Sequence, residues 1–137
     1  MNTKQYQALR QLQNANVKAT KENTIKFNAG GSSETIKHIV GKTLVARSGL
    51  LNGYQIDTEV EVPQGEIDVL LHSHPDRSTY AVELETGLTD ETKTSKIRRY
   101  VNSVAPIDDI IFIEVTNIPM DMVEAQEYIN KQLGLQS

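Results

Sequence analysis

Three acidic residues, Asp68, Glu83 and Glu85, have the types and the spacing that could hold a divalent cation. They lie in two stretches, residues 67–72 and 80–85, in which apolar and polar residues alternate as they do in strands. The intervening HPDRST has the composition of a reversing loop, so the two stretches predict a hairpin. Because side chains alternate across a strand, Glu83 and Glu85 share a face, and Asp68 joins them in the register that buries the apolar residues together.

Carboxylates that converge beside an apolar layer repel one another strongly unless a cation compensates their charge. A hard divalent ion such as Mg²⁺, which takes oxygen ligands, is the natural compensator. The alternative is that Asp68 and Glu83 are ordinary exposed strand residues without a ligand.

The composition bounds the possible classes of protein. A chain of 137 residues with 38% hydrophobic and 23% charged residues is typical of one globular domain. The net charge of −4 is not typical of nucleic-acid-binding domains, which are usually basic, and it counts modestly against a nuclease. The absence of cysteine excludes disulfides and thiolate metal sites. Without a long apolar run or a signal-peptide core, we expect a soluble, intracellular, cytoplasmic protein with no membrane partner.

The first half of the chain predicts a basic arm, a helix and a strand. We expect a short helix within residues 1–16, a small strand at 24–27 and a flexible break at 28–33; the simplest interpretation of this arm is a packing segment, and the alternative is a remnant of a DNA-binding appendage. A helix capped by Ser32 or Ser33 runs to about Ser48 and ends at Gly49. Residues 54–62 alternate as a half-exposed strand, which continues into the hairpin as a meander.

The second half predicts helix, strand, helix. The helix spans about residues 89–104, and its apolar stripe places Lys93 and Lys96 towards the sheet near Glu85, with Arg98 and Arg99 pointing outward. The nearly continuous apolar run IIFIEV at 110–115 is typical of a central buried strand, in parallel pairing after a crossover helix. An amphipathic helix over residues 119–133 follows.

Asp68, followed fifteen residues later by Glu83-Leu84-Glu85, resembles the D…(D/E)xK signature of the PD-(D/E)XK nuclease superfamily, which includes restriction enzymes, archaeal Holliday junction resolvases and RecB-like nucleases. Glu85 stands at the usual lysine position, as Glu does in some restriction enzymes of the superfamily. The element order from Ser33 to about Val115 is also similar to the superfamily core. The resemblance implies an α/β fold with a restriction-endonuclease-like αβββαβ core, a mixed central sheet flanked by helices, and a short N-terminal helical arm. The arm would be residues 1–32 and the nuclease-like domain residues 33–137.

The resemblance further implies an endonuclease that hydrolyses DNA phosphodiesters with Mg²⁺ or Mn²⁺. Asp68 and Glu83 would ligate the metal, and Glu85 would hold a metal-bound water or accept its proton. Lys93 or Lys96 would supply the missing cation from the following helix. A plasmid or virus is a plausible setting, and cutting both strands would favour a homodimer.

Resolvases of the superfamily also use an acid on the first helix. Counting back from Gly53-Tyr54 leads to Lys42, with His38 one turn earlier, and neither is a carboxylate. Glu34 lies about two turns further away, a distance that weighs against it. His38 and Lys42, together with Arg98 and Arg99, are our candidates for nucleic-acid contacts, and for the first two an ordinary surface position is an equal alternative.

Two histidines next to the hairpin loop complete the set of candidates. His72 shares the Asp68 face four residues further on, which allows a phosphate contact or a role beside the metal. His74 lies in the loop, where exposed histidines are mostly without function. Two other functions stay open beside the nuclease. One is an inactive nuclease-fold protein that binds nucleic acid or supports assembly, because Glu85 replaces the lysine and the first-helix acid is missing. The other is a small structural module.

Overall fold

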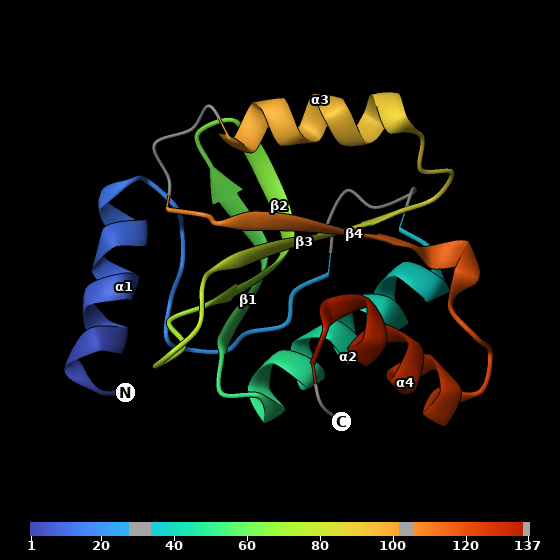
Figure 1. Cartoon of the computed structure of the whole chain (residues 1–137), viewed down its shortest axis with the longest axis horizontal. Helices are drawn as coiled ribbons and strands as arrows, with labels where there is room; N and C mark the ends of the chain where they lie inside the picture. The colour runs from blue at the N-terminus through green and yellow to red at the C-terminus, as the bar shows by residue number, and fades with distance from the viewer. Residues whose placement is uncertain (28–33, 102–105, 136–137) are drawn as a thin grey trace.

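A four-stranded mixed sheet forms the middle of the structure, and helices cover both of its faces (Figure 1). The structure is a computed structural model that describes residues 1–27, 34–101 and 106–135. The sheet has the order β1-β2-β3-β4. Its strands are β1 (Gln55–Val62), β2 (Gly65–His72), β3 (Tyr80–Glu85) and β4 (Asp109–Glu114). The helices are α1 (Thr3–Asn14), α2 (Ile36–Leu51), α3 (Asp90–Val101) and α4 (Met122–Leu133), with a 3-10 turn at Val115–Asn117.

The strand pairing confirms the predicted meander and the predicted parallel crossover. β1 pairs with β2 and β2 with β3 in antiparallel registers, in which Val60 faces Ile67 and Val69 faces Val82. β3 and β4 pair in parallel, with α3 in the connection between them. The expected α/β class with a mixed sheet is therefore what the structure has.

The position of β4 differs from the expectation of a central strand. β4 lies at an edge of the four-stranded sheet, and within it only Ile113 is fully buried. The apolar run has another cause: it packs against helices on both faces, since Ile113 belongs to one core cluster and Ile110 packs against the other. Burial of both faces makes a strand apolar throughout even where one of its edges is unpaired.

Two hydrophobic clusters lie on opposite faces of the sheet. One contains Val69, Leu71 and Val82 and packs against α2 and α4. The other contains Leu70 and Ala81 and is covered by residues of α1 and α3. Alternate side chains of β2 and β3 thus belong to opposite clusters, which is the period-two pattern of a strand that is covered on both sides.

Helix α2 continues past the glycine that was expected to end it. Thr35 caps the helix, since its hydroxyl accepts a hydrogen bond from the His38 N–H at 3.3 Å, whereas the expected caps Ser32 and Ser33 lie outside the described residues. A Cβ added to Gly49 would lie 2.6 Å from Leu71 Cδ2, so the glycine lets the helix approach the sheet closely. The turn glycine is instead Gly53, whose φ is +89°.

The segment after α1 runs along the outer edge of β1 without becoming the predicted strand at 24–27. It is held by isolated hydrogen bonds rather than by a ladder: the Lys18 N–H donates to the Glu61 carbonyl, and the Lys26 N–H donates to the Thr58 hydroxyl at 2.5 Å. Side chains replace backbone partners here, so no regular register forms. The flexible break predicted at residues 28–33 lies outside the described residues.

The remaining helices begin later than predicted. Asp121 caps α4 by accepting a hydrogen bond from the Glu124 N–H at 3.0 Å, and Gly134 ends the helix in the left-handed conformation. α3 begins at Asp90, and its predicted end near residue 104 lies outside the described residues. Among the residues that the structure describes, no helix has both the length and the apolar character needed to cross a bilayer.

Candidate metal centre

The candidate site lies where β2 and β3 separate. Their regular pairing extends to Val69 and Val82, and one step further Asp68 and Glu83 stand opposite each other. Here side-chain carboxylates take the place of backbone partners: the Leu84 N–H donates to Asp68 Oδ2 at 2.8 Å, and the Asp68 N–H donates to Glu83 Oε2 at 3.3 Å. The splayed strands therefore turn both acids inward at one point of the sheet.

The three predicted acids meet. One carboxylate oxygen from each of Asp68, Glu83 and Glu85 lies within 4.8 Å of the others. Oxygens at such separations can be drawn onto one hard cation with small side-chain movements, because Ca²⁺ and Mg²⁺ take carboxylate oxygens at about 2.0–2.6 Å. The geometric prediction made from alternation and register is thus confirmed, while the ion itself stays a prediction.

Glu83 is the most enclosed member of the cluster, with 1% of its surface exposed. Burial and the neighbouring Asp68 charge raise the pKa of Glu83 to about 8. Burial also raises the pKa of Asp68, although hydrogen bonds from Glu83 and from the Leu84 N–H oppose that shift. Two acids that share one site cannot both ionise freely, so in the metal-free protein the pair releases its last proton at a higher pH than an isolated carboxyl does.

Helix α3 supplies two groups to the cluster from consecutive turns. The Lys96 ammonium forms an ion pair with Glu85 and lies 3.9 Å from Glu83 Oε1. The Tyr100 hydroxyl lies 3.0 Å from Glu83 Oε1 and 2.9 Å from the Glu66 carbonyl oxygen, and it can donate to either. Burial tends to lower the pKa of Lys96, but the Glu85 and Glu83 carboxylates outweigh it and raise that pKa. Lys96 is therefore a fixed positive charge at the acids.

The two lysines proposed from the helical stripe have different positions. Lys96 reaches the acids, as predicted. Lys93 is one turn too early, and in the described part of the chain it forms no ion pair with Asp68, Glu83 or Glu85. Only the second candidate therefore has a place in the site.

The acid cluster borders a hollow of about 300 Å³, and Glu34, His38 and Glu59 line its other side, which we call the second wall. The hollow is lined by Glu34, His38, Glu59, Asp68, Leu84, Glu85 and Thr86. Behind this wall the Lys42 ammonium is 2% exposed; it pairs with Glu34 and with Glu59, the latter at 2.6 Å, and donates to the Lys26 carbonyl at 3.0 Å. Burial opposes a charged Lys42, yet hydrogen bonds to both glutamates raise its pKa.

The second wall changes what the sequence indicated about three residues. Lys42 faces its carboxylate partners and not solvent, so its burial gives no support to the predicted nucleic-acid contact. Glu34, whose distance along the chain weighed against it, lines the same hollow as Asp68. His38 lines the hollow as well, where a contact with a bound phosphate stays a prediction.

Glu59 and Glu66 are site acids that the sequence did not single out. Glu59 has a φ of +50°, which interrupts the β1–β2 pairing between Thr58 and Val60 and marks a strained position. A hydrogen bond with Glu59, together with partial burial, raises the pKa of Glu66 to about 7. The alternation of residues 54–62 predicted an ordinary solvated face, and a positive φ at a glutamate leaves no signal in that pattern.

His72 and His74, the two histidines next to the hairpin loop, do not belong to the site. His72 is fully buried; its Nε2 lies 2.8 Å from Asp57 Oδ2 and its Nδ1 lies 2.9 Å from the Ser73 hydroxyl. The suggested role beside Asp68 is therefore wrong, because these contacts use both ring nitrogens elsewhere. His74, expected to be exposed, is partly buried; its Nε2 contacts the Asn52 carbonyl at 2.8 Å and its ring packs on Tyr54.

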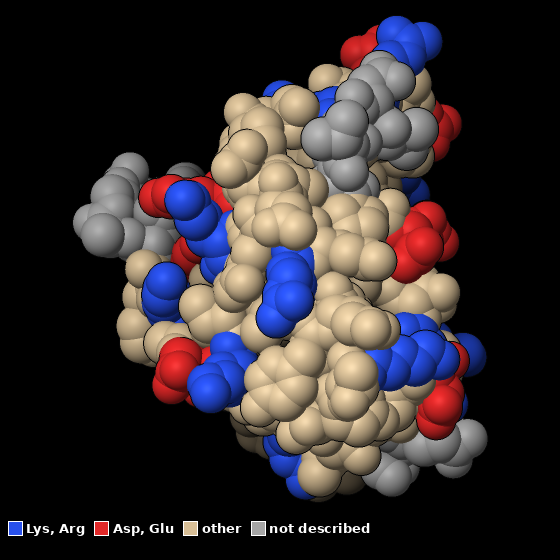
Figure 2. Space-filling view, turned by 90° about the vertical axis from the view of Figure 1, so that its left-hand side faces the viewer, with Lys and Arg blue, Asp and Glu red and all other residues tan. Residues whose placement is uncertain are grey.

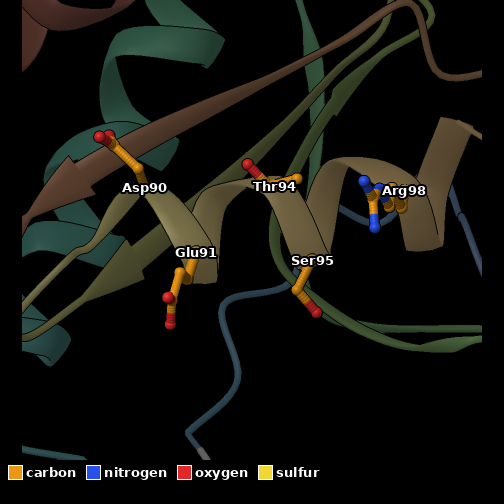
Figure 3. Close-up of a pocket in the computed structure, with 5 residues that line it drawn as sticks. All are labelled: Asp90, Glu91, Thr94, Ser95 and Arg98. Atoms are coloured by element: carbon orange, nitrogen blue, oxygen red, sulfur yellow. The ribbon is translucent and has the colours of Figure 1, made fainter.

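Arg98 and Arg99 point outward, as predicted, since both side chains are exposed. Arg98 borders a hollow on the outer surface of α3, where Asp90, Glu91, Thr94 and Ser95 also project (Figure 3). All five residues come from one helix, so among the described residues this hollow has no opposite wall that could enclose a ligand. The predicted nucleic-acid contacts of both arginines stay predictions.

No family model, no curated protein and no solved structure matches this chain.

Proposed function

We propose that this protein is a metal-dependent DNA endonuclease of the PD-(D/E)XK type, with a restriction-endonuclease-like core. The observation that supports this function best is the convergence of Asp68, Glu83 and Glu85 within 4.8 Å, with a lysine beside them. The chain order of one helix, three antiparallel strands, a helix and a parallel strand agrees with that core.

The donor set fits a hard divalent cation. All three groups are carboxylates, and burial together with the Asp68 charge raises the pKa of Glu83, an effect that a bound cation would oppose. Asp68 and Glu83 would hold Mg²⁺ or Mn²⁺, which when bound would polarise a phosphate and lower the pKa of a water molecule.

The chain's own groups suit the remaining steps of phosphodiester hydrolysis. Glu85 is less buried than Glu83, so one of its oxygens can accept the proton of an attacking water. Lys96 lies beside Glu85, where its ammonium can turn to the negative phosphate. Tyr100 holds Glu83 in position through its hydroxyl. These roles place the function of the usual lysine on Lys96, one element further along the chain.

The test is a plasmid-nicking assay with Mg²⁺ or Mn²⁺. We expect Asp68→Asn and Glu83→Gln each to lower the rate by at least about 100-fold, because a catalytic metal supplies several kcal/mol of transition-state stabilisation. Glu127→Gln, an exposed glutamate on α4, is the matched control and keeps the wild-type rate. Equal rates in all four proteins would exclude this site as the source of cleavage.

A second candidate function is a nucleic-acid-binding or assembly protein that has the nuclease fold without its activity. The ion pair between Lys96 and Glu85 favours it, because both groups neutralise each other in the position where catalysis needs them. DNA binding with no cleavage under either metal, in wild type as in the variants, would support this alternative.

A further inference from the structure

Positive charge is concentrated at the beginning of the chain. Residues 1–27 hold five Lys or Arg and one acid, Glu22, so this arm has a net charge of +4. The other 110 residues hold nine Lys or Arg and seventeen Asp or Glu, a net charge of −8. The first 21 residues contain no acid at all. Such asymmetry within one chain is typical of proteins that bind a polyanion with one region.

The arm is fixed to the sheet, so its charges have defined positions. Leu12 and Val17 are buried in the core cluster that α3 also covers. The Gln5 amide donates to the Ser73 carbonyl at 2.9 Å, and the Thr20 N–H donates to Asp57 at 2.8 Å. The Lys and Arg side chains are all exposed: Lys4, Arg10, Lys18, Lys21 and Lys26.

The arm also leads to the candidate metal centre. α1 lies on one side of the molecule, and the chain then follows β1 to Lys26, whose carbonyl accepts a hydrogen bond from Lys42 behind the site wall. Figure 2 shows the α1 side: Lys and Arg side chains are scattered over a mostly uncharged surface, from its centre to its margins, while the Asp and Glu side chains lie towards the margins. The arm is thus a basic surface that ends beside an acidic site.

We propose that this arm surface binds the phosphate backbone of DNA, which rests on the proposed function because the phosphodiester-cleaving site lies at its end. Lysine and arginine neutralise phosphates irrespective of base sequence, so the surface would position a duplex rather than select one. The acidic body of the protein repels DNA elsewhere, which restricts the backbone to this side.

The chemistry of α1 favours DNA over a lipid surface. Its apolar residues Leu9 and Leu12 face the core, and in the described helix Tyr6 is the large hydrophobic residue left exposed, so the outward side lacks the continuous apolar stripe with which helices enter a membrane interface. That outward side has exposed amides, at Gln7 and Gln11, and amides donate hydrogen bonds to phosphate and sugar oxygens.

The test measures binding of a fluorescent 20-base-pair duplex in EDTA, where cleavage cannot occur, as a function of salt. The arm variant combines Lys4→Gln, Arg10→Gln and Lys21→Gln, and the control combines Lys37→Gln, Arg47→Gln and Lys131→Gln on α2 and α4. Both remove two lysines and one arginine. We expect the arm variant to weaken binding at least about tenfold and to reduce the salt slope by up to ~2.7, since each lost phosphate contact lowers it by ~0.9. The control keeps the wild-type slope, and thermal unfolding verifies that both variants fold.

Equal weakening by both variants, or no binding by the wild type, would overturn the proposal. So would binding to phosphatidylserine vesicles in place of the duplex, or self-association that the arm variant abolishes, because these outcomes assign the surface to a lipid or to a second copy. The two proposals can be rejected independently. Binding that depends on the arm, without cleavage, would reject only the proposed hydrolysis. Cleavage that the arm variant does not affect would reject only the proposed binding surface.

Discussion

Two aspartates on neighbouring strands are withdrawn from solvent but have opposite kinds of neighbour: Asp57 is surrounded by hydrogen-bond donors, and Asp68 lies beside other carboxylates. Asp57 on β1 accepts three hydrogen bonds, from the Thr20 N–H, the Thr20 hydroxyl and His72 Nε2, each at 2.8 Å. Asp68 on β2 accepts one backbone hydrogen bond, from Leu84, and faces the carboxylate of Glu83. Both aspartates are largely withdrawn from solvent, yet only the second has its negative charge opposed by another acid.

The difference shows that burial of an acid does not by itself indicate a site. Around Asp57 every neighbour is a donor, so the network closes and joins the arm to the sheet. Around Asp68 the residues that the structure describes supply one cation, Lys96, to three carboxylates. Buried carboxylates without enough donors or cations destabilise the folded state, and selection for stability alone would replace them. We therefore assign the second region, and not the first, to a ligand.

Replacement of Asp57 gives the largest loss of stability that we expect from a single substitution. Asp57→Asn turns an amide N–H towards the Thr20 and His72 donors, and we expect the free energy of unfolding to fall by ~2 kcal/mol, the typical cost of leaving buried polar groups unpaired. Urea denaturation measures this change, with Asp76→Asn in the exposed hairpin loop as control. A stability equal to wild type would mean that the two regions do not differ as described.

The pH dependence of stability tests the other region. The pKa of Glu83 is raised from an ordinary 4.5 to about 8, so the folded, metal-free protein binds a proton that the unfolded chain has already released. The contribution of Glu83 to stability is therefore fully present below about pH 4.5 and is lost as pH rises towards 8, by at most ~1.4 kcal/mol per pH unit for this one group. Thermal unfolding in EDTA between pH 5 and 8 measures the slope.

Glu83→Gln sharpens this test, because the amide cannot ionise. We expect the variant to lose most of the slope and to unfold at a higher temperature than wild type at pH 8. The partly exposed Glu66, whose pKa is raised to about 7, leaves a small residual slope of the same sign. A slope that persists unchanged in Glu83→Gln would place the titration elsewhere.

Removal of the Tyr100 hydroxyl gives the smallest effect. Tyr100→Phe keeps the ring in the core and leaves Glu83 without that hydrogen bond, so we expect Mn²⁺ affinity to fall between about 3-fold and 10-fold, the equivalent of about one hydrogen bond. Calorimetric titration of the metal measures the affinity. Tyr6→Phe, an exposed tyrosine of α1, is the control. An unchanged affinity would limit Tyr100 to packing.

Much of the local structure followed from patterns within the chain. Alternation in residues 67–72 and 80–85 predicted both strands, and the reversing loop predicted their antiparallel pairing. Because the period of a strand is two, the register that buries Val69 against Val82 also brings Asp68 opposite Glu83. The carboxylate cluster was therefore predictable from sequence, as was the approach of Lys96 along the stripe of its helix.

The partners of single side chains depended on segments distant in sequence. Lys42 is buried because Glu34 and Glu59 meet it from a segment before α2 and from β1. His72 forms a hydrogen bond with Asp57, which lies fifteen residues away on the neighbouring strand. The edge position of β4 depends on which strands lie beside it, and its composition reflects only that both faces are covered.

Apart from the predicted strand at 24–27, the sequence by itself determined the strands and helices of the described structure and which acids share a face, because periodicity is a local property of the backbone. Only the tertiary structure decided which charges are neutralised and which are left in excess. Electrostatic balance is a sum over neighbours from several segments, and no spacing along one segment encodes it.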